Sequence, residues 1–213
     1  MVIEIPDDVR EQVRKTFSQM SKPITIHAFL SEKHCLLCNE TREILIILEE
    51  LSQGKLHVDY CECDTDSDKA KKFEIERHPA IIYSDFPNVR FYGIPAGFEF
   101  GSLVEAFVDA ANGVDMPDRI KESVKAIDKK VTIKTFVTPT CPYCPRMIRA
   151  GQRFGMVNSN ILAEGIEATE YPELSQKYAV FGVPKTVIND KINIDGLVPE
   201  NVIIDKINLA LKE

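Results

Sequence analysis

The chain has 213 residues, of which 44% are hydrophobic and 28% are charged. This composition is typical of a globular protein and excludes a disordered or fibrous chain. Lys and Arg number 26 against 33 Asp and Glu, a net charge of −7, which argues against general affinity for nucleic acid or anionic membranes, because both require a basic surface. The longest apolar run, residues 44–48, is far shorter than the ~20 residues that span a bilayer. The first residues lack the basic start and apolar stretch of a signal peptide, so we expect a cytoplasmic protein.

The predicted elements occur twice in the same order. Each half has an amphipathic segment, a β-rich run, a Cys-x-x-Cys pair that opens a helical pattern, a second strand, a polar helix, a proline, two strands and a closing helix. In the first half these are residues 7–20, 24–29, 35–51, 58–61, 68–74, 79, 80–83 with 89–92, and 102–111. In the second half they are residues 118–130, 131–136, 141–157, 165–168, 173–178, 184, 186–188 with 192–194, and 201–211.

This internal repeat predicts two domains. The two Cys pairs are 106 residues apart, and a proline follows each pair after 41 or 40 residues. The turn-rich loop 112–117 is the natural boundary, which gives an N-terminal domain of residues 1–116 and a C-terminal domain of residues 117–213. The first carries 12 basic and 21 acidic side chains (−9), and the second carries 14 and 12 (+2). The two domains therefore share a plan but not a surface charge.

The two Cys-x-x-Cys pairs allow three interpretations: a four-thiolate zinc site, two redox sites, or inert core cysteines. Compact zinc sites separate their Cys pairs by ~12–20 residues, whereas 102 residues intervene here. A Cys-x-x-Cys between a strand and a helix places its first sulfur at the helix N-terminus, where free N–H groups and the helix dipole favour a thiolate. We therefore favour redox chemistry, with Cys35 and Cys141 as nucleophiles and Cys38 and Cys144 as resolving cysteines.

These motifs resemble those of a known family. The resemblance is carried by Cys-Pro-Tyr-Cys-Pro at 141–145, Val-Pro-Lys at 183–185, Pro-Ala at 79–80, and residues 90–100. The chain resembles the thioredoxin superfamily, and more closely the glutaredoxin-like protein disulfide oxidoreductases of thermophilic archaea and bacteria. The resemblance covers essentially the whole chain. It implies an α/β fold of two tandem thioredoxin-like domains, each a mixed β-sheet with helices on both faces.

The resemblance also implies substrate-binding residues. Pro79 and Pro184 are expected to be cis and to face the cysteine pairs, and the backbone at His78 and Val183 is expected to pair with an extended substrate segment. Tyr143, between two active-site cysteines, is expected to be exposed beside the disulfide.

Glu167 is a candidate proton acceptor. It precedes Pro184 by 17 residues, as Glu62 precedes Pro79, and we place it on the central strand of its half. A buried acid under a disulfide can take the proton of the resolving cysteine if its pKa is raised. The alternative is an exposed carboxylate at a strand end.

We predict a protein disulfide oxidoreductase that reduces, and in some settings forms or isomerises, disulfides in protein substrates. The C-terminal pair is expected to dominate, because Leu36 and Leu37 supply neither a polar group nor a rigid ring between the N-terminal cysteines. The resemblance implies electrons from a thioredoxin-reductase-like flavoprotein, with no cofactor bound here. A peroxiredoxin is a further candidate partner. The alternatives are a redox adaptor that docks a peroxiredoxin or reductase, with the N-terminal site vestigial, and metal storage.

Two further cysteines, Cys61 and Cys63, stand outside the repeat. A Cys-x-Cys on a strand directs both side chains to one face, which suits a metal or a strained disulfide. We favour the simpler interpretation that they are small apolar fillers of a buried strand.

Overall fold

The computed structural model describes residues 4–31, 33, 35–62 and 68–212. The first half of the chain folds into α1 (Asp7–Ser18), β1 (Ile24–Leu30), α2 (Cys38–Leu51), β2 (Leu56–Glu62), α3 (Asp68–Lys72), β3 (Ala80–Tyr83), β4 (Val89–Tyr92) and α4 (Phe98–Asn112). The second half folds into α5 (Asp118–Lys125), β5 (Val131–Val137), α6 (Cys144–Val157), β6 (Ile161–Glu167), α7 (Pro172–Lys177), β7 (Lys185–Ile188), β8 (Ile192–Asp195) and α8 (Glu200–Ala210). This order confirms the predicted repeat of elements.

Several elements differ from the expected bounds; α4, for example, begins at Phe98 rather than at residue 102. Two further differences have a visible cause. Helix α5 ends at Lys125 rather than continuing to residue 130, because the side-chain amide of Asn158 donates to the carbonyl oxygens of Val124 and Ile127 and so satisfies the last turn. Strand β6 begins at Ile161, four residues before the expected start, because it pairs in parallel with β5 along its whole length from Val131.

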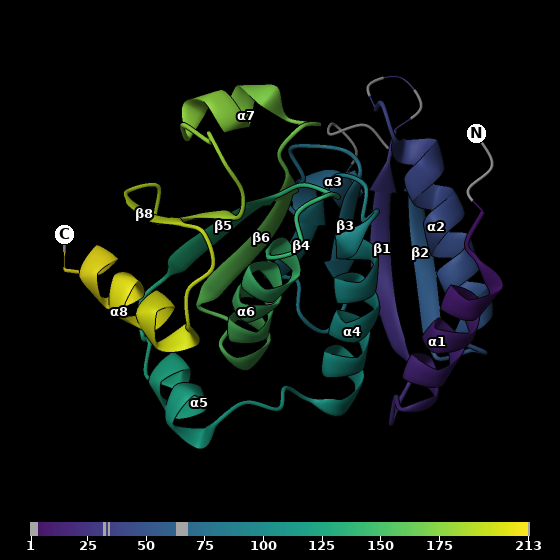
Figure 1. Cartoon of the computed structure of the whole chain (residues 1–213), viewed down its shortest axis with the longest axis horizontal. Helices are drawn as coiled ribbons and strands as arrows, with labels where there is room; N and C mark the ends of the chain where they lie inside the picture. The colour runs from purple at the N-terminus through teal and green to yellow at the C-terminus, as the bar shows by residue number, and fades with distance from the viewer. Residues whose placement is uncertain (1–3, 32, 34, 63–67, 213) are drawn as a thin grey trace.

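The strands form one eight-stranded sheet in the order β2-β1-β3-β4-β6-β5-β7-β8 (Figure 1). Within each half, one parallel pair is followed by two antiparallel pairs, the mixed sheet expected of a thioredoxin-like domain. The fold class is therefore confirmed. The sequence did not indicate that the two sheets join: β4 pairs in parallel with β6, from Val89 opposite Ala163 to Tyr92 opposite Ile166.

Helices cover both faces of the sheet. Helices α4 and α6 lie side by side on one face (Figure 1) and run in the same direction, since Arg149 of α6 pairs with Glu105 and Asp109 of α4 and Arg153 pairs with Asp109. Side chains of α3 and α7 pack on the opposite face, where an apolar cluster joins Ala70 and Leu174 to alternate strand residues.

The apolar core crosses the expected domain boundary. One cluster unites residues of the first half with Val137, Cys141, Cys144 and Ile148 of the second. Another draws Val114 and Met116 into the core of the second half. The boundary at residue 116 stays a prediction. The two halves are in contact through the β4–β6 pairing and the shared apolar core, and we call this contact the seam. In the described part of the chain, no helix has the length and apolar character needed to cross a membrane.

Candidate redox sites

The C-terminal cysteine pair lies where β5 leads into α6. Cys141 and Cys144 form a disulfide, with their Cα atoms 5.5 Å apart, and α6 begins at Cys144. The backbone N–H of Cys144 donates to Cys141 Sγ over 3.2 Å. Cys144 is completely buried, whereas Cys141 retains 8% of its surface. A thiolate on Cys141 is therefore the accessible one, and it lies where a helix N-terminus stabilises negative charge.

The second proline loop faces this disulfide. The Val183–Pro184 peptide bond is cis, as predicted. Cys141 Sγ lies 3.6 Å from the carbonyl oxygen of Val183, so the backbone before the proline borders the sulfur. Tyr143 is exposed, as expected from its place between the two cysteines.

The N-terminal pair has the same covalent geometry with different hydrogen bonds. Cys35 and Cys38 form a disulfide with a Cα–Cα distance of 5.5 Å. The backbone N–H of Ser31 donates to Cys38 Sγ over 3.3 Å, so this hydrogen bond reaches the second sulfur rather than the first. Cys35 is half-buried and Cys38 is buried. Leu36, between them, is 84% exposed.

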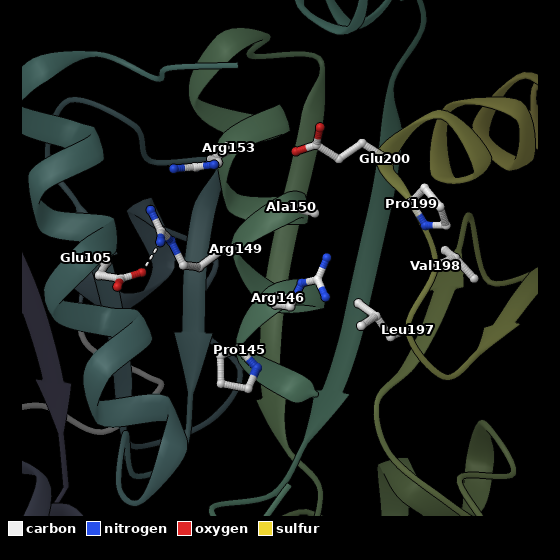
Figure 2. Close-up of a pocket in the computed structure, with 10 residues that line it drawn as sticks. All are labelled: Glu105, Pro145, Arg146, Arg149, Ala150, Arg153, Leu197, Val198, Pro199 and Glu200. Carbon is white, nitrogen blue, oxygen red and sulfur yellow. Dashed lines mark hydrogen bonds and ion pairs between the residues drawn. The ribbon is translucent and has the colours of Figure 1, made fainter. Parts of the chain in front are cut away.

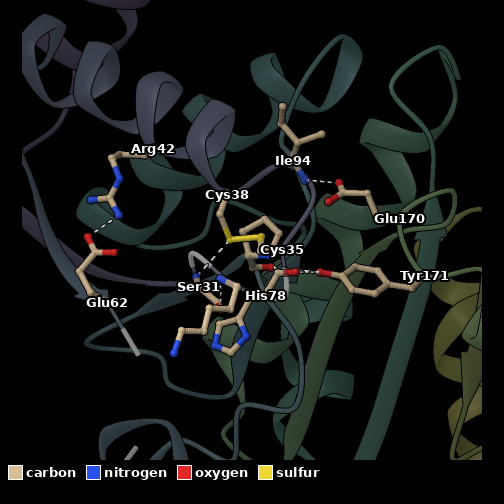
Figure 3. Close-up of a disulfide and its surroundings, with 11 residues drawn as sticks. Ser31, Cys35, Cys38, Arg42, Glu62, His78, Ile94, Glu170 and Tyr171 are labelled. Atoms are coloured by element: carbon tan, nitrogen blue, oxygen red, sulfur yellow. Dashed lines mark hydrogen bonds and ion pairs between the residues drawn. A yellow bond between two sulfur atoms is a disulfide. The ribbon is translucent and has the colours of Figure 1, made fainter. Parts of the chain in front are cut away.

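A residue of the second half completes the surroundings of the N-terminal pair. The His78–Pro79 peptide bond is cis, as predicted. Tyr171, which follows β6, donates its hydroxyl to the carbonyl oxygen of His78 over 2.9 Å (Figure 3). The carbonyl group before this proline therefore already has a side-chain donor, whereas the carbonyl group of Val183 borders the Cys141 sulfur.

Glu167 is buried, with 1% of its surface exposed, which overturns the alternative of an exposed strand-end carboxylate. It accepts hydrogen bonds from Thr169 Oγ1 and from the backbone N–H of Glu170. One detail was wrong: β6 is an edge strand of its own half, and it becomes central only because β4 pairs with it. Its counterpart Glu62 lies on the sheet edge strand β2, half-exposed and paired with Arg42 (Figure 3).

Two more carboxyl groups near Glu167 were not predicted. Glu99, in the first turn of α4, is 1% exposed. Burial, together with the charge of Glu167, raises the pKa of Glu99 to about 8. Glu170 accepts from the backbone N–H of Ile94 (Figure 3), and burial raises its pKa to about 7, with Glu167 and Glu40 adding to the shift. The signal for Glu99 was its place within the motif of residues 90–100.

A pocket of about 450 Å³ lies beside the C-terminal site (Figure 2). Pro145, directly after Cys144, lines it together with Arg146, Arg149 and Arg153 of α6. Arg149 and Arg153 are engaged by acids of α4. Residues 197–200, at the start of α8 and just before it, line the other side of the pocket.

Cys61 lies in the apolar cluster below α3, as expected of a filler. It is also disulfide-bonded, so the interpretation as a mere filler is wrong for this residue. Cys63 lies outside the described residues. Over the ranges that the structure describes, no three His, Cys, Asp or Glu side chains group in a way that suits a metal ion.

Comparisons with known proteins agree with this geometry. The family described as Thioredoxin domain matches residues 130–208. A solved structure of a protein disulfide oxidoreductase from Aeropyrum pernix is 33% identical, covers 99% of this chain and 95% of its own, and has a TM-score of 0.91. A structure of the alkylhydroperoxide reductase AhpF from Enterococcus faecalis (C503A mutant) is 27% identical, with coverage of 95% and 99% and a TM-score of 0.87.

Among curated proteins, the alkyl hydroperoxide reductase AhpF of Pseudomonas aeruginosa is 26% identical over 204 residues, 94% of this chain. The chain spans only 37% of the length of that relative. With its thioredoxin folds, its two Cys-x-x-Cys disulfides and a similar structure that matches it almost end to end, the chain belongs to the protein disulfide oxidoreductases and is a thiol–disulfide oxidoreductase.

Proposed function

We propose that this protein exchanges disulfides with protein substrates, mainly through Cys141 and Cys144. The observation that carries the proposal is the arrangement at Cys141: its sulfur receives the N–H of Cys144 at the start of α6 and borders the Val183 carbonyl group. A donor at a helix N-terminus stabilises a thiolate. The thiolate is the attacking species in disulfide exchange.

Reduction of a substrate then proceeds in two exchanges. The Cys141 thiolate attacks one sulfur of the substrate disulfide, and the other substrate sulfur leaves as a thiolate that takes a proton from water. The Cys144 thiol loses its proton, with Glu167 as the proposed acceptor, and attacks Cys141 Sγ. The enzyme disulfide forms, the second substrate thiolate leaves, and two electrons have passed to the substrate.

Exposed apolar side chains support a protein as the substrate. Four large apolar residues with high exposure lie in segments that contain or border the two sites: Leu36, Phe98, Tyr143 and Phe181. Phe98 belongs to the first half, yet its backbone N–H donates to Pro139 in the loop that leads to Cys141. Solvent-exposed apolar groups near a reactive sulfur suit a polypeptide surface. We assign the backbone at Val183 and His78, with Pro184 and Pro79, to substrate pairing.

We assign the dominant role to the C-terminal site on the evidence of Tyr171. Its hydroxyl already donates to the His78 carbonyl oxygen, so an incoming strand at the N-terminal site competes with a hydrogen bond within the protein. The corresponding Val183 carbonyl group borders Cys141 Sγ, which has no proton to donate while it is in the disulfide.

Reduction of insulin disulfides by dithiothreitol tests this function. Cys141→Ser should lower the rate at least 100-fold, because the hydroxyl is a far weaker nucleophile at neutral pH. Cys35→Ser should lower it less than threefold. If neither substitution changes the rate, the proposal is wrong.

The similarity to the alkyl hydroperoxide reductase AhpF favours a second candidate. In it, the chain relays electrons from a flavoprotein reductase of the thioredoxin-reductase kind to a peroxiredoxin, and the N-terminal pair serves as a docking or transfer site. This role predicts that a peroxiredoxin is reduced faster than insulin at equal concentration. Equal rates with the peroxiredoxin and with insulin would instead favour a broad range of protein substrates.

A further inference from the structure

The sheet face that carries α3 and α7 is only partly covered by helices. These two helices have five and six residues, whereas α4 and α6 on the opposite face have 15 and 14. A pocket of about 550 Å³ lies between α7 and the segment that follows α3, over the strands β4, β6 and β5. Its floor therefore crosses the seam between the two halves. Small-molecule sites commonly have volumes of ~300–1,000 Å³ and often lie between domains.

Three charged side chains lie in a row on the floor of this pocket. Arg90 of β4 is directly opposite Glu164 of β6, and Glu164 is directly opposite Lys134 of β5. Adjacent strands are about 4.8 Å apart, so the three side chains are neighbours on one face of the sheet. The charges of both bases act on Glu164. The floor thus holds two bases and one acid.

Arg90 keeps hydrogen-bond donors that no protein group uses. Only 8% of its surface is exposed. Its Nε donates to the carbonyl oxygen of Pro87, and its Nη1 donates to the carbonyl oxygen of Glu74 and to the hydroxyl of Tyr92. In the ranges that the structure describes, its Nη2 has no hydrogen-bond partner and its guanidinium forms no ion pair. Buried arginines are rare unless they are paired, and their fixed N–H groups suit carboxylates and phosphates.

The acids of the pocket do not cancel the positive charge of its floor. Lys134 Nζ lies 2.8 Å from a carboxylate oxygen of Asp190 and 3.9 Å from one of Glu164. Glu164 is mostly buried, and burial raises its pKa against the effect of Lys134 and Arg90. The other three acids that line the pocket are exposed, so water and salt screen their charges: Glu74, Glu76 and Asp190. The interior of the pocket therefore favours an anion.

The walls of the pocket add further bases and an apolar surface. Arg77 and the exposed Lys177 line it, and Lys177 Nζ lies 4.9 Å from the centre of the Tyr178 ring. Three aliphatic side chains complete the lining: Leu162, Ile166 and Leu174. A ligand with an acidic group and an apolar body can use both parts of this surface.

We propose that this pocket binds a small organic anion, whose acidic group pairs with Arg90 and whose apolar body lies along Leu162, Ile166 and Leu174. A carboxylate and a phosphate ester both supply such an acidic group. Because the floor comes from both halves of the chain, the bound anion bridges the seam. The site is separate from the redox sites, since no cysteine lines it in the part of the chain that the structure describes.

Isothermal titration calorimetry of the full-length oxidised protein tests this site. The three probes share one apolar body: 2-naphthoate, 2-naphthyl phosphate and the neutral 2-naphthamide. Charge-assisted hydrogen bonds are stronger than neutral ones, so we expect at least one of the two anions to bind tenfold or more tightly than the amide. The tighter of the two anions identifies the acidic group that the pocket prefers.

Substitutions then assign the binding to this pocket. Arg90→Gln should weaken anion binding at least tenfold and leave the binding of the amide unchanged. Arg146→Gln is the matched control, because it removes an exposed arginine that lines the other pocket, beside the C-terminal site, and it should bind the anions as the wild-type protein does. Lys177→Gln removes an exposed charge and should weaken anion binding about two- to fivefold, which keeps the test decisive if Arg90→Gln folds poorly.

Amide chemical shifts locate the bound anion in the wild-type protein. The tighter anion should shift the amide signals of β4, β6 and α7 more than those of α4 and α6. Largest shifts on α6, equal affinities for the anions and the amide, or equal losses in Arg90→Gln and Arg146→Gln would overturn the proposal. So would the absence of saturable binding of both anions at millimolar concentrations.

Discussion

The two redox sites of this protein share a backbone plan and differ in their hydrogen bonds. Both disulfides join cysteines whose Cα atoms are 5.5 Å apart, and both helices that follow have 14 residues. At the C-terminal site the backbone N–H reaches the first sulfur, whereas at the N-terminal site it reaches the second. The carbonyl group before the cis proline borders a sulfur in one site and receives a tyrosine hydroxyl in the other. The two sites therefore have the same backbone geometry but different hydrogen-bond donors around their sulfur atoms.

The largest expected contrast is in covalent trapping. Cys144→Ser leaves the Cys141 nucleophile without its resolving partner, so mixed disulfides with a substrate protein should accumulate at Cys141. Cys38→Ser should accumulate at least tenfold less, because the N-terminal site has an occupied carbonyl group and, within the described residues, its first sulfur lacks the backbone N–H that Cys141 receives. Non-reducing electrophoresis with mass analysis measures both adducts. Equal trapping would remove the contrast between the sites.

The second prediction concerns stability and pH. A carboxyl group with a raised folded-state pKa binds more protons in the folded than in the unfolded protein between the two pKa values, so stability falls as pH rises through that interval. For Glu99 the interval runs from about pH 4.5, its ordinary pKa, to about 8. The unfolding free energy of the oxidised protein should therefore fall over this range, by at most about 1.4 kcal/mol per pH unit for this group.

Urea unfolding at several pH values measures this slope. Glu99→Gln should flatten it. Glu62→Gln is the control, because it removes the half-exposed carboxylate of the N-terminal half that pairs with Arg42. A flattening of equal size in both variants would contradict the role assigned to burial.

The third prediction gives a sign to the difference in redox potential. The N–H donated to Cys141 stabilises the reduced, thiolate form of the C-terminal pair. A hydrogen bond to a charged group contributes about 1.5 kcal/mol or more, and 1.4 kcal/mol corresponds to about 30 mV in a two-electron couple. The C-terminal site should thus be the more oxidising by about 30 mV. Titration in glutathione buffers, with each disulfide followed separately, measures the two potentials. Equal potentials, or a more oxidising N-terminal site, would refute the prediction.

The smallest expected effect is that of Tyr171→Phe. Loss of the phenol releases the His78 carbonyl group at the N-terminal site. Since a neutral hydrogen bond contributes about 1 kcal/mol, we expect a three- to fivefold faster reaction at Cys35, measured in a Cys141→Ser background. Tyr178→Phe removes a hydroxyl that pairs with Asp190 instead and serves as the control. An unchanged rate in Tyr171→Phe would show that this hydrogen bond does not cause the lower reactivity of the N-terminal site.

Local patterns predicted most of the fold. Strands β3 and β4 lie at the expected residues, because short β-branched and aromatic runs between turn signals have few alternatives. The junction between the halves could not be predicted from local patterns, since β4 and β6, which pair there, are far apart in sequence. Its consequence for function is visible in two equivalent acids. Glu62 and Glu167 each stand 17 residues before a cis proline, and only the one whose strand gains a second neighbour is buried.

The candidate site could likewise be predicted only where its residues belong to local motifs. The cysteines, the cis prolines and Tyr143 follow from motifs that are local in sequence. Tyr171 and Glu170 reach their partners across the seam, His78 and Ile94, so no spacing along one half could indicate them. Glu99 lay in a motif, but its burial near Glu167 of β6 depends on how the two halves pack together.

The pairing of β4 with β6 leaves the sheet with two free borders, β2 and β8, instead of the four that two separate domains would have. An unpaired strand border is a template for association with other chains. A fragment ending near residue 116 would uncover β4, and its complement would uncover β6, both rich in buried side chains. We therefore expect either half on its own to self-associate. We expect the intact chain to unfold as one cooperative unit, at a rate set by the contact between its two halves.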